Sequence, residues 1–144
     1  MKTIISIIIL TVTFVSCEIK PQPIDYGNES CAYCNMAIVH KQFASQIVND
    51  KGRAYSFDAI ECMINYHNEH KDQPVALFLA TDFKSPGELM DATDATFLIT
   101  EQIPSPMGAN LCGFKTRADA ETTQKEFGGK LYNWRQLLGF FKTS

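Results

Sequence analysis

The chain has 144 residues, of which 45% are hydrophobic and 20% are charged. This length suits one compact domain with a hydrophobic core of its own. The formal net charge of −3, without a basic run in the sequence, excludes a protein that binds nucleic acid through a positively charged surface.

The N-terminus predicts export from the cytoplasm. Lys2 precedes an apolar run from Ile4 to Val15, which suits a signal peptide but is short for a membrane-spanning helix. The small residue before Cys17 is typical of a lipobox, although Phe14 stands where leucine is usual. We expect residues 1–16 to be a signal peptide and Cys17 to carry a lipid that anchors the protein in the cell envelope, facing the periplasm. A plain secretory signal is the alternative.

Residues 17–30 are expected to form a flexible tether. They contain two prolines, a glycine and several charged residues, and they show no apolar periodicity. The folded domain is therefore expected to comprise residues 31–144.

The first half of this domain predicts a β-β-α-β unit. Two β-favouring segments flank Asn49-Asp50-Lys51-Gly52, which indicates a hairpin. Asp58 and Glu61 fit a capping box at the start of the helix that follows. The expected elements are strands at 44–48 and 53–57, a helix from 58 to about 70, and a strand at 75–80.

The second half repeats this order more loosely. A polar stretch at 81–93 contains Pro86-Gly87 and is expected to be an exposed loop. Gly128-Gly129 is a typical stop for the second helix. The expected elements are strands at 95–100 and 110–115, a helix at 116–127, a short strand at 131–132 and a helix at 133–141. The predicted fold class is α+β, with two related β-β-α-β halves in one compact domain.

Soft donor atoms gather in Cys31-Ala32-Tyr33-Cys34-Asn35-Met36, and two thiols with a thioether suit Cu(I). Met107 lies between Pro106 and Gly108, where it is an unlikely helical core residue, and it is a further candidate ligand. His40 offers an imidazole, although a surface histidine at the start of a hairpin is as good an interpretation. A methionine such as Met36 also serves ordinary core packing.

The cysteines allow other interpretations. Without Cys17, an even number of cysteines remains, which outside the cytoplasm is compatible with two disulfides. The Cys31-x-x-Cys34 pair also occurs in zinc sites and in thiol-disulfide oxidoreductases, but Cys62 and Cys112 lack the spacing of a second zinc pair. Cys62 is expected to be buried or to form a disulfide. The rival functions are therefore a membrane-anchored thiol-disulfide oxidoreductase and a structural envelope lipoprotein.

Several motifs together resemble the NosL family. They are Cys34-x-Met36, Phe57-Asp58-Ala59-Ile60-x-Cys62-Met63, Pro106-Met107-Gly108 and Gly128-Gly129, and the resemblance spans about Cys31 to Phe140. It implies a lipid-anchored copper chaperone, not an enzyme, that delivers Cu(I) to nitrous oxide reductase of denitrification or to its assembly machinery. It also implies a fold similar to that of organomercurial lyase.

On this resemblance, residues 31–144 are a copper-binding domain whose ligands are Cys34, Met36 and Met107. Cys31 and His40 are additional candidates. Some family members have a single cysteine in the first motif, so Cys31 is either a second copper thiolate or a disulfide partner of Cys34. A low-coordinate site would let a ligand from a partner protein attack the ion before the chaperone's own ligands leave it.

Overall fold

The computed structural model describes residues 18–142, so the expected signal peptide and lipidated Cys17 lie outside the described residues. No helix among the residues described is long and apolar enough to cross a membrane. The elements are β1 (Ser45–Asn49), β2 (Ala54–Phe57), α1 (Ile60–Glu69), β3 (Val75–Asp82), β4 (Ser85–Asp91), β5 (Thr96–Ile99), β6 (Leu111–Phe114), α2 (Arg117–Phe127), β7 (Lys130–Asn133) and α3 (Trp134–Phe140).

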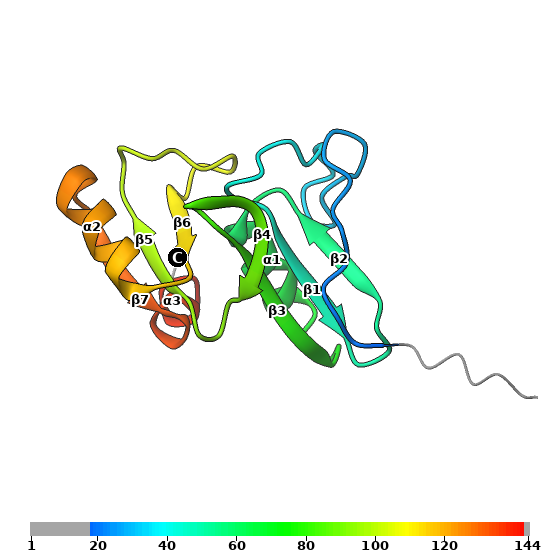
Figure 1. Cartoon of the computed structure of the whole chain (residues 1–144). Helices are drawn as coiled ribbons and strands as arrows, with labels where there is room; N and C mark the ends of the chain where they lie inside the picture. Colours follow the sequence, from blue (N-terminus) through cyan, green and yellow to red (C-terminus); the bar gives the residue numbers. More distant parts are fainter. Residues whose placement is uncertain (1–17, 143–144) are drawn as a thin grey trace, which may run out of the picture.

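The strands form two antiparallel sheets, ordered β2-β1-β3-β4 and β6-β5-β7, which lie side by side in Figure 1. In each half the first strand is central and pairs with the second strand on one side. The strand that follows the helix pairs with its other side. The predicted α+β class with two similar β-β-α-β halves is confirmed.

One strand was not predicted from the sequence. Residues 81–93 were expected to be an exposed loop, but β4 pairs with β3 at the edge of the first sheet, so that prediction is wrong. Pro86 and Gly87 are tolerated because an edge strand needs fewer backbone hydrogen bonds and packs on one side. Within β4 only Met90 is buried, so the sequence lacks the alternation that identifies a half-buried strand.

The start of α1 also differs from the prediction. Its N-cap is Ala59, without a side-chain hydrogen bond, so Asp58 and Glu61 do not form the expected capping box. Both carboxylates are buried, Asp58 with 2% and Glu61 with 3% of its surface exposed. A true capping box joins Asn133 and Gln136 at the start of α3.

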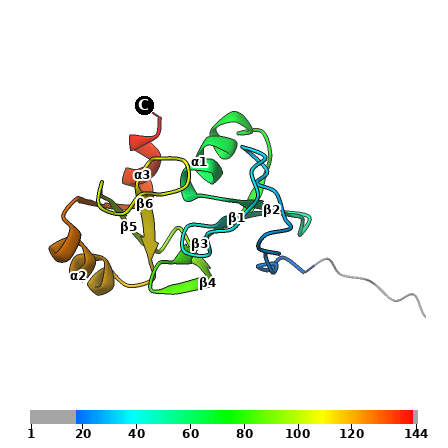
Figure 2. The same cartoon turned by 90° about the horizontal axis from the view of Figure 1, so that it is seen from above.

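The main core fills the space between α1, the first sheet and the inner side of the second sheet. Phe57, Met63 and Phe97 are fully buried in it, and Leu137 of α3 closes it. A smaller core around Phe114 lies under α2. Figure 2 shows α1 and α3 on the same side of the molecule and α2 at one end. Helix α1 contacts β1 and β2 of the first half and β6 of the second.

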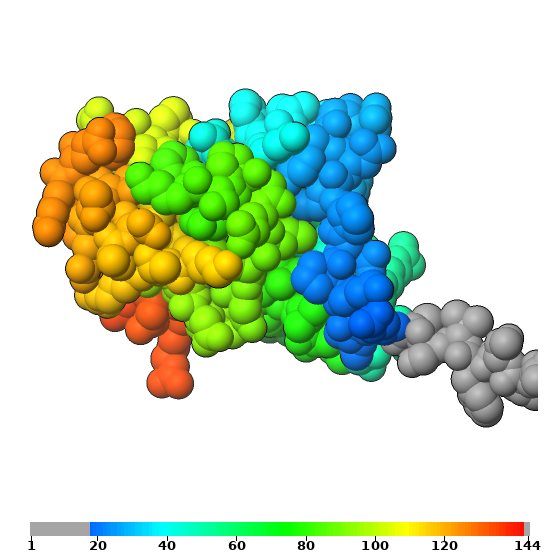
Figure 3. Space-filling view, in the orientation of Figure 1, coloured from blue at the N-terminus to red at the C-terminus, as the bar shows by residue number. Residues whose placement is uncertain are grey.

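Contacts with the domain begin inside the segment expected to be a tether. The backbone N–H of Gln22 donates to Gln46 Oε1 at 2.8 Å, and Gln46 Nε2 donates to the Gln22 carbonyl at 3.1 Å. The Gly27 N–H donates to the Ile38 carbonyl at 2.8 Å. Figure 3 shows these N-terminal residues, in blue, lying along the surface of the first half.

Candidate metal centre

Two cysteines of one short turn, Cys31 and Cys34, meet a third, Cys62, at the first turn of α1. The Sγ atoms of Cys31, Cys34 and Cys62 all lie within 4.8 Å of one another. All three are free thiols; Cys31 and Cys62 are buried, whereas Cys34 is partly exposed. The sequence pattern predicted Cys31 and Cys34 as candidate ligands and Cys62 as a buried residue or a disulfide partner. The structure brings Cys62 into the same cluster.

The turn at residues 31–36 directs its two thiols to one side. The Cys31 N–H donates to the Met36 carbonyl at 2.8 Å, and the Asn35 N–H donates to the Cys31 carbonyl at 3.0 Å. Asn35 adopts a left-handed conformation with φ of 62°, which asparagine tolerates better than most residues. The Ala32 N–H donates to the Ser56 carbonyl at 2.9 Å, which fastens the turn to β2.

The three thiols differ in acidity. A hydrogen bond from the Cys62 thiol, helped by backbone N–H groups of Cys34, Asp58 and Tyr33, lowers the pKa of Cys31 to about 5, although burial opposes this. The pKa of Cys62 is raised because its thiol donates to Cys31 and is buried. Burial also raises the pKa of Cys34. At neutral pH the metal-free cluster therefore holds one thiolate, stabilised by neighbouring donors, and two thiols.

Asp58 adds a buried carboxylate beside the cluster. Burial raises the pKa of Asp58, and the nearby charge of Cys31 raises it further, whereas His40 opposes the shift. The Asp58 Oδ1 atom has no hydrogen-bond partner among the residues described. His40 itself lines a small cavity of about 220 Å³ together with Pro104 and Pro106. It therefore lies next to the loop that carries Met107, while the three-thiol cluster does not include it.

The two candidate thioethers are accessible from solvent. Met36 has 55% and Met107 has 42% of its surface exposed. Met36 follows the thiol turn directly, and Met107 lies in the loop between β5 and β6. Figure 1 shows this loop reaching across the molecule toward the segment that follows Met36, and both lie along the same upper edge in Figure 3. A ligand role for Met36, Met107 and His40 stays a prediction.

Cys112 lies apart from this cluster. It is buried in the smaller core, and its thiol donates to the Leu98 carbonyl at 3.7 Å. Burial raises the pKa of Cys112 to about 12. Because Cys62 belongs to the thiol cluster and Cys112 is a free thiol, a Cys62–Cys112 disulfide is not formed in this structure. Cys112 is also no candidate for a fourth ligand.

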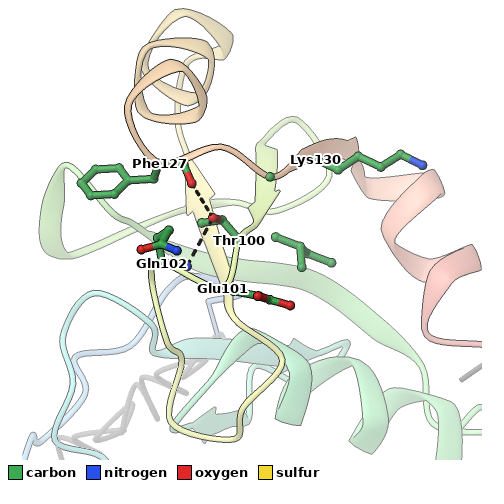
Figure 4. A pocket seen from close by; sticks show the side chains of 7 residues that line it. Thr100, Glu101, Gln102, Phe127 and Lys130 are labelled. Atoms are coloured by element: carbon green, nitrogen blue, oxygen red, sulfur yellow. Dashed lines mark hydrogen bonds between the residues drawn. The ribbon is translucent and has the colours of Figure 1, made fainter.

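A hollow of about 450 Å³ in the second half has a different chemistry. It lies between the end of β5 and the C-terminal end of α2. Thr100 Oγ1 donates to the Phe127 carbonyl at 2.9 Å across it, and Glu101, Gln102 and Lys130 also line it (Figure 4). Its lining contains no sulfur atom, so it does not extend the candidate metal centre.

Comparisons with known proteins agree with this architecture. The model of the NosL family matches residues 23–138, most of the described domain. Among solved structures, the copper chaperone NosL from Shewanella denitrificans is similar with a TM-score of 0.70 and 22% sequence identity. The alignment covers 83% of this chain and 96% of that chain. At this identity the likeness shows a shared fold. A search of curated proteins finds no significant match.

Proposed function

Because the chain belongs to the NosL family, we propose that it is a copper chaperone that carries Cu(I) as its cargo. The observation that carries this proposal is the meeting of three cysteine sulfur atoms, Cys31, Cys34 and Cys62, within 4.8 Å of one another. The structurally similar protein from Shewanella denitrificans is described as a copper chaperone, which supports the same class of function here.

The donor set favours Cu(I) over the other common metals. Thiolate and thioether ligands are soft and suit Cu(I), zinc and iron–sulfur clusters, whereas Mg²⁺ and Ca²⁺ require oxygen ligands. A structural zinc site takes four ligands in a tetrahedron. The cluster offers three thiols, and the remaining cysteine of the described domain, Cys112, is buried in another core. Three sulfur atoms are sufficient for Cu(I).

The exposure of the donors suits delivery. Cys31 and Cys62 are buried, Cys34 is partly exposed, and Met36 and Met107 face solvent. The ion can then be held by buried sulfur atoms and approached through the exposed thioethers. A partner ligand adds to the ion before the last chaperone ligand leaves, so copper is transferred without being released. The recipient that we propose is nitrous oxide reductase or its assembly machinery.

The site of action that we propose is the outer side of a membrane in the cell envelope. A lipid on Cys17, followed by the segment up to Gln22, would hold the domain near that membrane. The first contacts with the domain at Gln22 leave Glu18–Pro21 as the connection to the anchor. This arrangement would keep the chaperone close to an exported recipient.

Anaerobic titration with Cu(I), against a competing chelator, tests the proposal. We expect the wild-type domain to bind a single Cu(I) ion, and Cys34→Ser to weaken binding by at least about tenfold, equivalent to about 1.4 kcal/mol. Cys112→Ser is the matched control, because this cysteine is also free but lies outside the cluster. Absence of stoichiometric binding, or equal losses in the two variants, would contradict the proposal.

A thiol-disulfide oxidoreductase is less well supported. The thiolate that attacks a disulfide must be accessible as well as acidic. Here the acidic thiol is Cys31, which has only 1% of its surface exposed, while the more accessible Cys34 has a raised pKa. The acidity and the accessibility that this chemistry needs therefore occur on different residues.

A further inference from the structure

Glu61 makes an unusual set of contacts in the first turn of α1. Its Oε1 atom accepts a short hydrogen bond from the Ser105 hydroxyl and a longer one, at 3.3 Å, from the Ala109 N–H. Both partners belong to the loop between β5 and β6, which lies more than forty residues away in the sequence. Met107 lies between these two contacts in the sequence.

Burying this carboxylate is costly. Glu61 has 3% of its surface exposed, and its Oε2 atom has no hydrogen-bond partner in the part of the chain that the structure describes. None of the ion pairs within residues 18–142 involves Glu61. Burial of a carboxylate without a cationic partner destabilises the folded protein. A leucine at this position would pack in the core without that cost, so helix formation alone does not account for Glu61.

The loop is organised around the same contact. The Ser105 hydroxyl, which donates to Glu61, also accepts from the Asn110 N–H at 2.9 Å. The Gly108 N–H donates to the Ser105 carbonyl at 3.0 Å, which closes a tight turn around Met107. Glu61 therefore holds both ends of the turn whose exposed residue is Met107.

The neighbour of Glu61 in α1 is Cys62. Glu61 thus joins the loop that carries a thioether to the helical turn that carries a cluster thiol. We propose that Glu61 is a positioning residue that fixes the Met107 loop against the thiol cluster, so that the Met107 thioether is held ready for the ion. This inference rests on the proposed copper binding and assigns to Glu61 a role in it.

The physical advantage is preorganisation. A thioether on a loose loop must be ordered when it binds the ion, and that ordering reduces affinity. A loop already fixed by hydrogen bonds presents its sulfur at high effective concentration. Residues that orient metal ligands in this way typically change metal affinity by about 10- to 100-fold when they are replaced.

A double-mutant cycle with Cu(I) as the probe tests this role. We expect Glu61→Leu and Met107→Leu each to weaken Cu(I) binding by about 10-fold or more. Because Glu61 acts through Met107, the double variant should bind no more weakly than Met107→Leu alone. Glu61→Gln keeps an acceptor oxygen for Ser105 and Ala109, so it should restore most of the affinity.

A second measurement does not depend on copper. In the metal-free protein, Glu61→Leu should increase amide hydrogen exchange at Ala109 and Asn110 and shift the methyl resonance of Met107, whereas Glu61→Gln should not. If Glu61→Leu does not fold, Ser105→Ala breaks the same contact from the loop side and takes its place in the cycle.

The outcomes separate this inference from the proposed function. Additive losses in the cycle, or a Met107→Leu variant with unchanged affinity, would overturn the role of Glu61 and leave copper binding by the thiols intact. Failure of the wild-type protein to bind Cu(I) would overturn both. An unchanged exchange rate at Ala109 and Asn110 in Glu61→Leu would show that the carboxylate does not hold the loop.

Discussion

In both halves the second strand ends at a fully buried phenylalanine, Phe57 in β2 and Phe114 in β6, and a helix begins three residues later. The starts of the two helices then differ. In α2, the Thr116 hydroxyl caps the helix by accepting from the Asp119 N–H at 3.1 Å. In α1, the N-cap is Ala59, which offers no side-chain acceptor.

The space at the start of α1 holds the thiol cluster instead. The Asp58 N–H and neighbouring backbone donors stabilise the Cys31 thiolate, and Cys62 is the third residue of the helix. The positive end of a helix dipole favours such an anion. The first turn of the helix is thus stabilised by a side-chain cap in the second half, whereas in the first half the equivalent turn forms part of a candidate metal centre. Residues that depart from ordinary capping mark the half with the chemistry.

The largest losses of stability are expected at the two buried phenylalanines that end β2 and β6, which occupy equivalent positions in the two halves. Phe57→Ala and Phe114→Ala should each lower the free energy of unfolding by about 3–5 kcal/mol, because each removes a fully buried ring and leaves a cavity. Chemical denaturation monitored by circular dichroism measures this loss. A loss below about 1 kcal/mol in either variant would show that the two positions are not equivalent in packing.

Copper should stabilise the protein mainly through the thiol cluster at the start of α1, in the first half. At a free Cu(I) concentration of about 1,000 times the dissociation constant, binding to the folded state adds about 4 kcal/mol to the free energy of unfolding. Cys62→Ser should remove most of this gain. Asp119→Asn, at the corresponding third position of α2, should retain it. Anaerobic thermal unfolding with and without Cu(I) measures the difference, and a gain retained in Cys62→Ser would contradict the comparison.

Acidification should weaken copper binding. The pKa values of Cys34 and Cys62 are raised, so both are protonated in the metal-free protein at neutral pH, whereas Cys31 has a pKa of about 5 and is ionised. Binding by three thiolates therefore releases about two protons near pH 7. The apparent affinity should fall about 100-fold per pH unit as the pH decreases. Chelator competition from pH 6 to 8 measures this slope, and a pH-independent affinity would exclude these two thiols as ligands.

The smallest effect is expected at the capped helix. Thr116→Ala should lower the free energy of unfolding by about 1 kcal/mol, since the Asp119 N–H loses its side-chain acceptor. Its Cu(I) affinity should equal that of the wild-type protein. A change in affinity would mean that the second half contributes to the site through α2.

The sequence was sufficient to predict most of the fold. Hydrophobic patterns and turn residues locate every helix and every strand except β4, whose single buried residue, Met90, provides no alternation. The capping box was misplaced because Asp58 and Glu61 have the right spacing, although Ala59 is the N-cap and the Glu61 side chain accepts from Ser105 instead. Local spacing does not reveal such long-range hydrogen bonds.

The candidate site was predicted in part. Cys31 and Cys34 are close in the sequence, so their shared position follows from one short motif. Cys62 was missed because its proximity depends on α1 packing beside the turn at 31–36. The available signal was helical geometry: adjacent residues project about 100° apart. Cys62 and Met63 are both buried in the main core, so this geometry gives the two side chains different directions but does not place Cys62 beside the turn.

X-ray absorption at the copper edge of the Cu(I)-loaded protein is the most direct test of the three-thiol copper site. We expect the nearest shell to consist of sulfur atoms, with Cys31, Cys34 and Cys62 among the donors. Cys62→Ser should lower the sulfur coordination number, and Cys112→Ser should leave the spectrum unchanged. A first shell of nitrogen or oxygen atoms, or a spectrum that Cys62→Ser does not alter, would contradict the assignment of the three-thiol cluster as the copper site.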